Sequence, residues 1–180
     1  MASKKQKKNR IGIILIVEDV YMVRRTVHLM LESAGHKVIE APDAQKAMDF
    51  IKSGQVPDLI ILDIAMPGMD GLDFLRVLRA YKDTKTTPIM MCTARGEEDT
   101  IKKARQNGAT DFMVKPVNRD TIVAKVKQIL EEHPPASARL AEAAEAAEKI
   151  ALEDEDAPSQ NEKPEAKKKK KKAKKKETKN

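Results

Sequence analysis

The chain has 180 residues, of which 41% are hydrophobic and 35% charged, and its formal net charge is +7. This length fits one ordinary domain, and no stretch reaches the roughly 18–20 apolar residues of a membrane-spanning helix. A single cysteine and three scattered histidines exclude an internal disulfide and argue against a cysteine or histidine metal site. Aromatic residues make up only 3% of the chain, which disfavours a base-stacking surface for nucleic acid.

The positive charge is concentrated at the two ends of the chain. Residues 1–10 hold five basic and no acidic residues, and residues 167–180 hold ten lysines and one glutamate. Between them, the sequence is nearly neutral up to residue 130 and strongly acidic from 131 to 166. Large aliphatic residues become rare after His133, too few to bury a second core. We therefore predict a basic disordered N-terminus over 1–10, one folded domain over 11–132, an acidic Ala/Glu-rich linker over 133–166 with a helix at 137–152, and a disordered polylysine tail over 167–180.

Short apolar runs alternate with segments of helical periodicity from residue 11 to residue 130. The apolar runs predict buried strands at 11–17, 37–40, 58–62, 88–92 and 111–114. The periodic segments predict helices at 21–34, 43–53, 71–81, 97–107 and 118–130. The chain order is therefore a strand-helix unit repeated five times.

Short, continuously apolar strands joined by helices are typical of a parallel sheet that helices cover on both faces. Right-handed crossovers between such strands produce a doubly wound α/β sandwich. Functional groups in these folds lie beyond the carboxyl ends of the strands. The residues that follow each predicted strand are therefore the candidate site.

Polar residues stand at four of these strand ends. Glu18 and Asp19 follow the first strand, Asp63 the third, Thr93 the fourth and Lys115 the fifth. Carboxylates brought this close repel one another unless a cation neutralises them, and oxygen ligands suit Mg²⁺. The sequence thus predicts a magnesium site in which the lysine balances the remaining charge or holds a phosphoryl oxygen.

Each of these residues also has a purely local interpretation. Asp63 alone could cap a helix, and Glu18 with Asp19 could cap the helix that begins at Tyr21. Their joint placement at separate ends of one sheet favours a functional site.

Four sequence stretches resemble the receiver domain of bacterial response regulators, in particular the single-domain, chemotaxis-type receivers. They are Ile-Leu-Ile-Val-Glu-Asp at 14–19, Leu-Ile-Ile-Leu-Asp-Ile-Ala-Met-Pro-Gly-Met-Asp-Gly at 59–71, Met-Met-Cys-Thr-Ala at 90–94 and Gly-Ala-Thr-Asp-Phe-Met-Val-Lys-Pro at 108–116. The resemblance implies a flavodoxin-like (βα)5 fold whose five-stranded parallel sheet has the strand order 2-1-3-4-5.

The resemblance also implies roles for the acidic residues. Asp63 matches the phosphoacceptor, a carboxylate nucleophile that forms an aspartyl phosphate. Asp19 matches a direct ligand of Mg²⁺, Glu18 a ligand acting through water, and the backbone carbonyl of Ala65 the remaining protein ligand. Asp63 itself completes this metal site.

Three further positions match the family's switch and phosphate-binding residues. Lys115 matches the lysine that pairs with a phosphoryl oxygen, and Thr93 the hydroxyl that bonds the phosphoryl group. Phe112 matches the aromatic switch residue, which here lacks the hydroxyl of a tyrosine.

The function implied is that of a phosphoacceptor signalling protein in a two-component phosphorelay, not an enzyme beyond its own phosphotransfer and dephosphorylation. The donor would be a phosphohistidine on a sensor kinase or phosphotransfer protein, and the output a switched protein-binding surface. As the alternative, Lys167–Lys176 binds nucleic acid or an acidic membrane nonspecifically as the main output. We expect a cytoplasmic protein, because Glu18 and Asp19 interrupt the apolar run 11–17 that would otherwise mimic a secretory leader.

Overall fold

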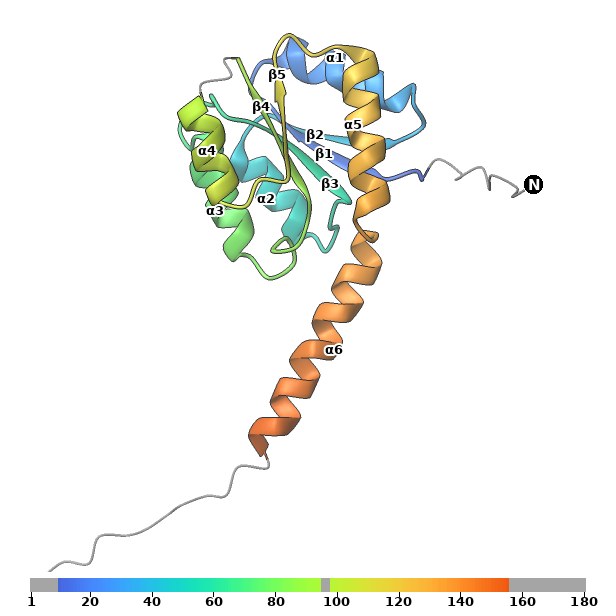
Figure 1. Ribbon diagram of the computed structural model, residues 1–180, viewed down its shortest axis with the longest axis vertical. Coiled ribbons are helices and arrows are strands. Elements are labelled where there is room, and N and C mark those ends of the chain that lie inside the picture. Colours follow the sequence, from blue (N-terminus) through green and yellow to red (C-terminus); the bar gives the residue numbers. More distant parts are fainter. Residues whose placement is uncertain (1–9, 95–97, 156–180) are drawn as a thin grey trace, which may run out of the picture. The chain divides into compact units, whose positions relative to one another are not determined.

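The computed structural model describes residues 10–94 and 98–155, with 147–155 described by their backbone alone. The strands are β1 (Ile13–Val17), β2 (Lys37–Ala41), β3 (Leu59–Asp63), β4 (Ile89–Thr93) and β5 (Asp111–Val114). The helices are α1 (Tyr21–Glu32), α2 (Ala44–Lys52), α3 (Gly71–Ala80), α4 (Glu98–Gln106), α5 (Arg119–Glu132) and α6 (Ala136–Glu155). The predicted alternation of strands and helices is confirmed (Figure 1).

All five strands pair in parallel in one sheet, in the order β2-β1-β3-β4-β5. This is the predicted fold and strand order. Leu15 of β1, for example, pairs with Ile39 of β2 on one side and Ile60 of β3 on the other. Every residue of β3 and β4 is buried, which explains why these strands are continuously apolar and do not alternate with polar residues.

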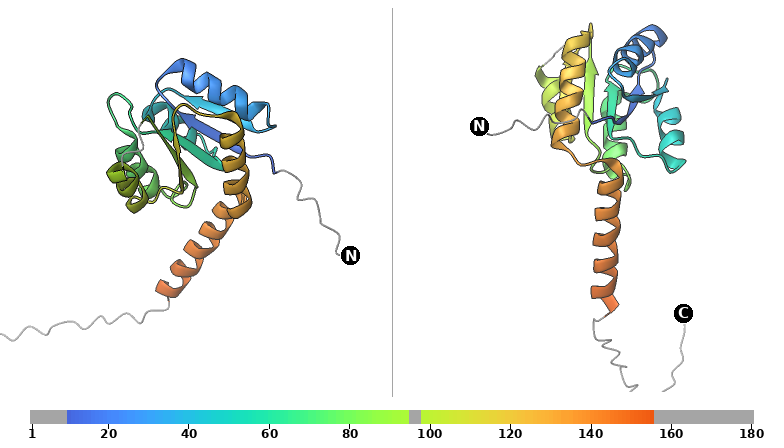
Figure 2. Two further views of the ribbon diagram at one scale, coloured as in Figure 1. Left: turned by 45° about the horizontal axis from the view of Figure 1, so that its top comes forward. Right: turned by 90° about the vertical axis from the view of Figure 1, so that its right-hand side faces the viewer.

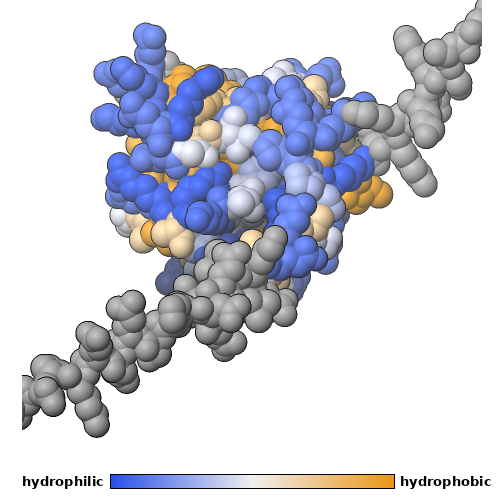
Figure 3. Space-filling model, turned by 60° about the horizontal axis from the view of Figure 1, so that its bottom comes forward, coloured by the Kyte–Doolittle hydropathy of each residue, from blue (hydrophilic) through white to orange (hydrophobic). Residues whose placement is uncertain are grey.

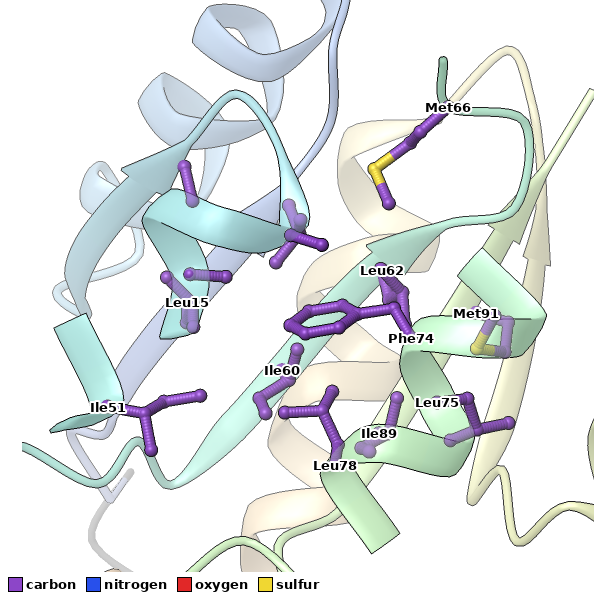
Figure 4. Packing of buried hydrophobic residues seen from close by; sticks show 14 of the residues in the cluster. Leu15, Ile51, Ile60, Leu62, Met66, Phe74, Leu75, Leu78, Ile89 and Met91 are labelled. Carbon is purple, nitrogen blue, oxygen red and sulfur yellow. The ribbon is translucent and has the colours of Figure 1, made fainter. Parts of the chain in front are cut away.

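Successive residues of each strand point to opposite faces of the sheet, and each face has its own core. Leu15 and Val17 join one cluster with α2, α3 and Ala104 of α4, whereas Ile14 and Ile16 join another with α1 and α5. Figure 2 shows the sheet from two further directions, and Figure 4 shows the first cluster, with Phe74 packed among the strand residues. The two clusters pack the sheet on both faces and so hold in place the strands whose carboxyl ends carry the candidate site residues.

Several element boundaries differ from the predicted ones by one or two residues. The strands β3 and β4 begin one residue later than predicted. Asp58, just before β3, uses its side chain to accept the N–H of Ile13, and Pro88, just before β4, has no N–H to donate. The first helix ends at Glu32, before the predicted Ala34, and the chain then turns through Gly35 at a φ of 94°.

The helix predicted over 137–152 extends in the structure from Ala136 to Glu155. The helix therefore includes residues 153–155, which the sequence analysis placed beyond its end. Residues 1–9 of the predicted disordered N-terminus and the whole predicted tail at 167–180 lie outside the described residues, so the proposed division into domain, linker and tail stays a prediction.

No helix within the described parts of the chain is long and apolar enough to cross a bilayer. Hydrophilic residues also dominate the molecular face shown in Figure 3, with hydrophobic residues in small patches between them. Both observations agree with the absence of a long apolar stretch from the sequence.

A buried network of hydrogen bonds lies at the amino ends of the strands. Asp58, just before β3, is 8% exposed. Its Oδ1 atom accepts hydrogen bonds from a terminal nitrogen of Arg10 at 2.7 Å and from the backbone N–H of Ala136 at 2.8 Å, and its Oδ2 atom accepts from the N–H of Ile13 at 2.8 Å. One carboxylate thus joins the chain before β1 to the start of α6.

Two arginines extend this network to other loops. Arg10 also donates to the carbonyl oxygens of Leu130 and His133, both at 2.6 Å. Arg139, on the first turns of α6, donates to the carbonyl of Pro57 at 2.9 Å and to the Thr87 hydroxyl at 3.2 Å. Arg10 was predicted to belong to a disordered N-terminus and Arg139 to a linker, but their guanidinium groups are held by the folded domain because they satisfy its buried carbonyls.

Candidate functional site

Three carboxylates meet at the carboxyl ends of two neighbouring strands. Glu18 and Asp19 follow β1, and Asp63 is the last residue of β3. One oxygen atom from each side chain lies within 4.8 Å of the others. Glu18 and Asp63 are buried, at 3% exposed each, and Asp19 is partly buried. The sheet register explains the cluster, because Val17 pairs with Leu62 and the next residues of both strands therefore lie side by side.

The local alternative for the acidic pair, capping of the first helix, is wrong. The N-cap position of α1 is Val20, and no side chain caps it. Glu18 instead points toward the fifth strand's end, where its Oε2 atom lies 2.6 Å from the ammonium nitrogen of Lys115. The acidic pair therefore belongs to the site and not to the helix terminus.

Lys115 bridges two of the three carboxylates. Its Nζ atom lies 2.6 Å from Glu18 Oε2 and 2.8 Å from Asp63 Oδ1. Burial lowers the pKa of this lysine, but the bonds to Asp63 and Glu18 outweigh that effect, so the pKa ends above its ordinary value. The side chain is therefore a permanent ammonium group within the site at neutral pH.

The remaining charge and the remaining oxygen atoms favour a bound cation. Burial and the neighbouring Asp63 charge raise the pKa of Glu18, although Lys115 opposes them. Glu18 Oε1 and Asp19 Oδ1 are buried and have no hydrogen-bond partner within the described residues. Buried oxygens without partners are costly, and hard oxygen donors of this kind fit a divalent ion.

Asp63 is followed by a loop that folds back tightly over its backbone. The N–H of Gly71 donates to the carbonyl of Ile64 at 2.8 Å. A Cβ atom at position 71 would lie 2.0 Å from the Asp63 carbonyl oxygen, so only glycine fits there. This loop carries Ala65, the residue predicted to ligate the metal through its carbonyl, and Ala65 is exposed.

Thr93 and Phe112 lie on the adjacent strands β4 and β5. Thr93 is the last residue of β4, 6% exposed, and its carbonyl accepts from the backbone N–H of Lys115 at 2.8 Å. Phe112 on β5 is half-buried against the first core cluster, and the guanidinium carbon of Arg105 on α4 lies 5.3 Å from its ring centre. The structure thus brings Thr93 to the site edge, whereas Phe112 belongs to the layer under α4.

The sequence analysis missed Arg24, which is buried and contacts the acidic loop. A signal for it was available in the helical periodicity. Arg24 occupies the same buried stripe of α1 as Val27 and Leu31, and a charged residue on an apolar stripe indicates a specific buried partner.

The structure thus combines a doubly wound, five-stranded parallel sheet with three clustered carboxylates and a bridging lysine at the carboxyl ends of its strands. A sequence profile of the response regulator receiver domain matches residues 14–127. The chain belongs to this family, whose members act in phosphorylation-dependent two-component signalling.

Similar proteins support the same assignment. Chemotaxis protein CheY of Pseudomonas aeruginosa is 36% identical over 119 residues, which cover 66% of this chain and 95% of that protein. The phosphate regulon regulator PhoB of Klebsiella pneumoniae is 37% identical over 117 residues, but the chain spans only about half of its length, 51%. A putative response regulator from Chloroflexus aurantiacus superimposes with a TM-score of 0.64 at 34% identity, covering 68% of this chain and 99% of that structure.

Proposed function

We propose that Asp63 accepts a phosphoryl group from a phosphohistidine on a sensor kinase or histidine phosphotransfer protein. The observation that carries this proposal is the position of Asp63 at a carboxyl strand end, 2.8 Å from Lys115 and within 4.8 Å of two further carboxylates. A buried carboxylate with one ammonium partner and two acidic neighbours is typical of a reactive group and not of a structural one.

The chemical step forms one bond and breaks another. A carboxylate oxygen of Asp63 attacks the phosphorus atom, the new P–O bond yields an aspartyl phosphate, and the P–N bond to the imidazole breaks with its electron pair passing to nitrogen. Lys115, already within bonding distance of Asp63, holds a phosphoryl oxygen and balances its charge. The protein acts in this way only on its own phosphorylation state.

Glu18, Asp19, Asp63 and the Ala65 carbonyl would hold Mg²⁺, which when bound neutralises charge on the phosphoryl oxygens. The partnerless oxygens Glu18 Oε1 and Asp19 Oδ1 support this proposal. Glu18 already shares Lys115 with Asp63, which suits it to act through a water molecule.

Phosphorylation of Asp63 would change the protein surface through movements of Thr93 and Phe112. The Thr93 hydroxyl bonds the phosphoryl group, and Phe112 then buries its ring more deeply under α4. Because Arg105 covers that ring at 5.3 Å, the movement changes the surface formed by α4, β5 and α5. The proposed output is binding of a downstream protein to that surface.

Labelling with a small acyl phosphate tests the phosphoacceptor. We expect a Mg²⁺-dependent, acid-stable and base-labile adduct on the intact chain, and none on Asp63→Asn, because an amide is not a nucleophile here. Asp43→Asn is the matched control, since Asp43 caps α2, is not one of the three clustered carboxylates, and asparagine caps equally well. Undiminished labelling of Asp63→Asn would overturn the assignment.

A second candidate function rests on the lysine tail. Ten lysines within residues 167–180 can neutralise several phosphates of DNA, RNA or an anionic lipid surface. We expect sequence-independent DNA binding that weakens by roughly 10³–10⁵ between about 50 and 200 mM salt, if about 6–10 phosphates are contacted. Salt titrations of the intact chain and of a variant without 167–180 test this, and equal affinity of the two would refute it.

A further inference from the structure

One buried arginine connects the acidic loop to the second strand. Arg24 on α1 is 9% exposed and lies on the inward stripe of the helix. A fully charged side chain in that position is costly unless its N–H groups all find partners. Its partners therefore indicate what the arginine does.

The partners of Arg24 include the backbone of the two predicted metal ligands. Its Nη1 atom donates to the carbonyl oxygen of Glu18 at 2.6 Å and to that of Asp19 at 3.3 Å. Its Nε atom donates to the carboxylate of Glu40 on β2 at 3.2 Å. The ring of Tyr21 lies 5.6 Å from its guanidinium carbon and completes its surroundings.

We propose that Arg24 is a positioning residue for the cation site: it fixes the backbone of Glu18 and Asp19 so that their carboxylates face Asp63. This inference rests on the proposed Mg²⁺-dependent function. The loop needs such a support because α1 has no side-chain cap at Val20 to hold its first turn. Charge-assisted hydrogen bonds from a guanidinium are about twice as strong as neutral ones.

Glu40 anchors the arginine from the neighbouring strand. It also contacts the guanidinium of Arg25 at 3.3 Å and the imidazole of His28 at 2.7 Å. Arg24 differs from Arg25 in one respect that matters: Arg24 reaches the loop carbonyls, and the contact of Arg25 is to Glu40. The rigid fork of a guanidinium can bridge a carbonyl and a carboxylate, whereas the single ammonium of lysine is a poor substitute.

The expected effect follows from the general behaviour of groups that orient metal ligands. Loss of such a partner typically weakens metal affinity by about 10–100-fold. We therefore expect Arg24→Met to weaken Mg²⁺ binding by at least about tenfold. Arg24→Lys keeps the charge but loses the fork, so its affinity should lie between those of the intact chain and Arg24→Met.

The experiment is a Mg²⁺ titration of the full chain in which binding is measured from NMR chemical shifts. The Mg²⁺ dependence of acyl phosphate labelling is a second measurement. Arg25→Met is the matched control, because it removes a neighbouring cation from Glu40 and leaves the loop carbonyls bonded. We expect the Mg²⁺ affinity of Arg25→Met to stay within about twofold of that of the intact chain. This change is much smaller than the loss expected when an orienting group is removed. Thermal unfolding of each variant shows whether it is folded.

The outcomes separate this inference from the proposed function. Equal Mg²⁺ affinity of Arg24→Met and the intact chain overturns the positioning role, as does an equal loss in Arg24→Met and Arg25→Met. If Arg24→Met does not fold, Arg24→Lys decides, and an affinity equal to that of the intact chain overturns the role. If the intact chain itself binds no Mg²⁺ and accepts no phosphoryl group, the proposed function fails instead.

Discussion

Strand β3 has an aspartate at each end, and the two differ in what surrounds them. Asp58 precedes the strand and Asp63 ends it, and both are almost fully buried, at 8% and 3% exposed. Asp58 accepts three hydrogen bonds, from Arg10, Ile13 and Ala136, through both of its oxygen atoms. Asp63 meets one ammonium group and two other carboxylates.

This comparison separates a structural carboxylate, Asp58, from the proposed phosphoacceptor, Asp63. The carboxylate of Asp58 accepts hydrogen bonds from donors within the folded chain, so it needs no ligand to satisfy its charge. At the other end, Glu18 Oε1 and Asp19 Oδ1 lack hydrogen-bond partners among the described residues. The unsatisfied end is where a cation and a phosphoryl group can still contribute binding energy.

The largest expected effect is a reciprocal one between the two aspartates. Asp58→Asn should keep labelling by an acyl phosphate, whereas Asp63→Asn should lose it completely, because Asp58 takes no part in the site. In contrast, Asp58→Ala should lower the free energy of unfolding by about 3 kcal/mol, since it removes the acceptor of the Arg10 Nη2 group and of two backbone N–H groups. Urea unfolding and labelling of the same preparations provide the measurements.

Two results would contradict the comparison. Loss of labelling in a folded Asp58→Asn protein would mean that the amino end of the sheet takes part in the chemistry. A loss of stability in Asp63→Ala as large as that in Asp58→Ala would mean that the site carboxylate is structural as well.

Cys92 sharpens the comparison at the carboxyl end. It pairs with Asp63 across β3 and β4, and burial raises the pKa of its thiol to about 12. Only the thiolate reacts rapidly, so we expect alkylation in the folded protein to be about 10³-fold slower than in urea at mildly alkaline pH. Equal rates in both conditions would show that the site end is open and loosely packed.

Much of the fold and most of the site follow from local sequence patterns. The strands are recognisable because β3 and β4 are buried on both faces and hence continuously apolar. The site residues are recognisable because the carboxyl ends of parallel strands converge, so that Glu18, Asp63 and Lys115 meet although far apart in sequence.

The contacts that local patterns could not predict are those between distant segments. Arg139 resembles a solvated residue of an Ala/Glu-rich helix, yet its partners Pro57 and Thr87 come from two loops of the domain. Arg10 follows a lysine-rich segment and looks like part of it, but Asp58 holds it. Such pairings depend on where the folded chain leaves buried carbonyls and carboxylates without partners, which neither composition nor periodicity records.

Mg²⁺ should stabilise the fold through one end of β3 only. A ligand that binds the folded state at about 100 times its Kd raises the free energy of unfolding by about 2.7 kcal/mol. We expect a rise of this size in the intact chain and in Asp58→Asn, and a much smaller one in Asp19→Ala, which lacks a proposed ligand. Thermal unfolding with and without Mg²⁺ measures it, and a full increment in Asp19→Ala would remove Asp19 from the site.

The smallest effect concerns His36, which reports on the amino end of the sheet. The backbone N–H of Gly12, next to the Ile13 group that Asp58 binds, donates to His36 Nδ1 at 3.3 Å. This bond requires a ring nitrogen that carries no proton, and burial lowers the pKa of His36 below its ordinary value of 6.5. The unfolded chain therefore binds a proton at a higher pH than the folded one does.

The sign of the pH dependence follows directly. His36 contributes stability that is fully present above pH 6.5 and declines as the pH falls from there through the lower folded-state pKa. The difference in unfolding free energy between the intact chain and His36→Gln should therefore shrink over that range, while the Mg²⁺ increment measured at pH 7.5 stays equal in both, because His36 lies at the opposite end of the sheet from Asp63. A pH-independent difference would show that His36 stabilises the fold by packing alone, and a changed Mg²⁺ increment would show that the two ends of the sheet are coupled.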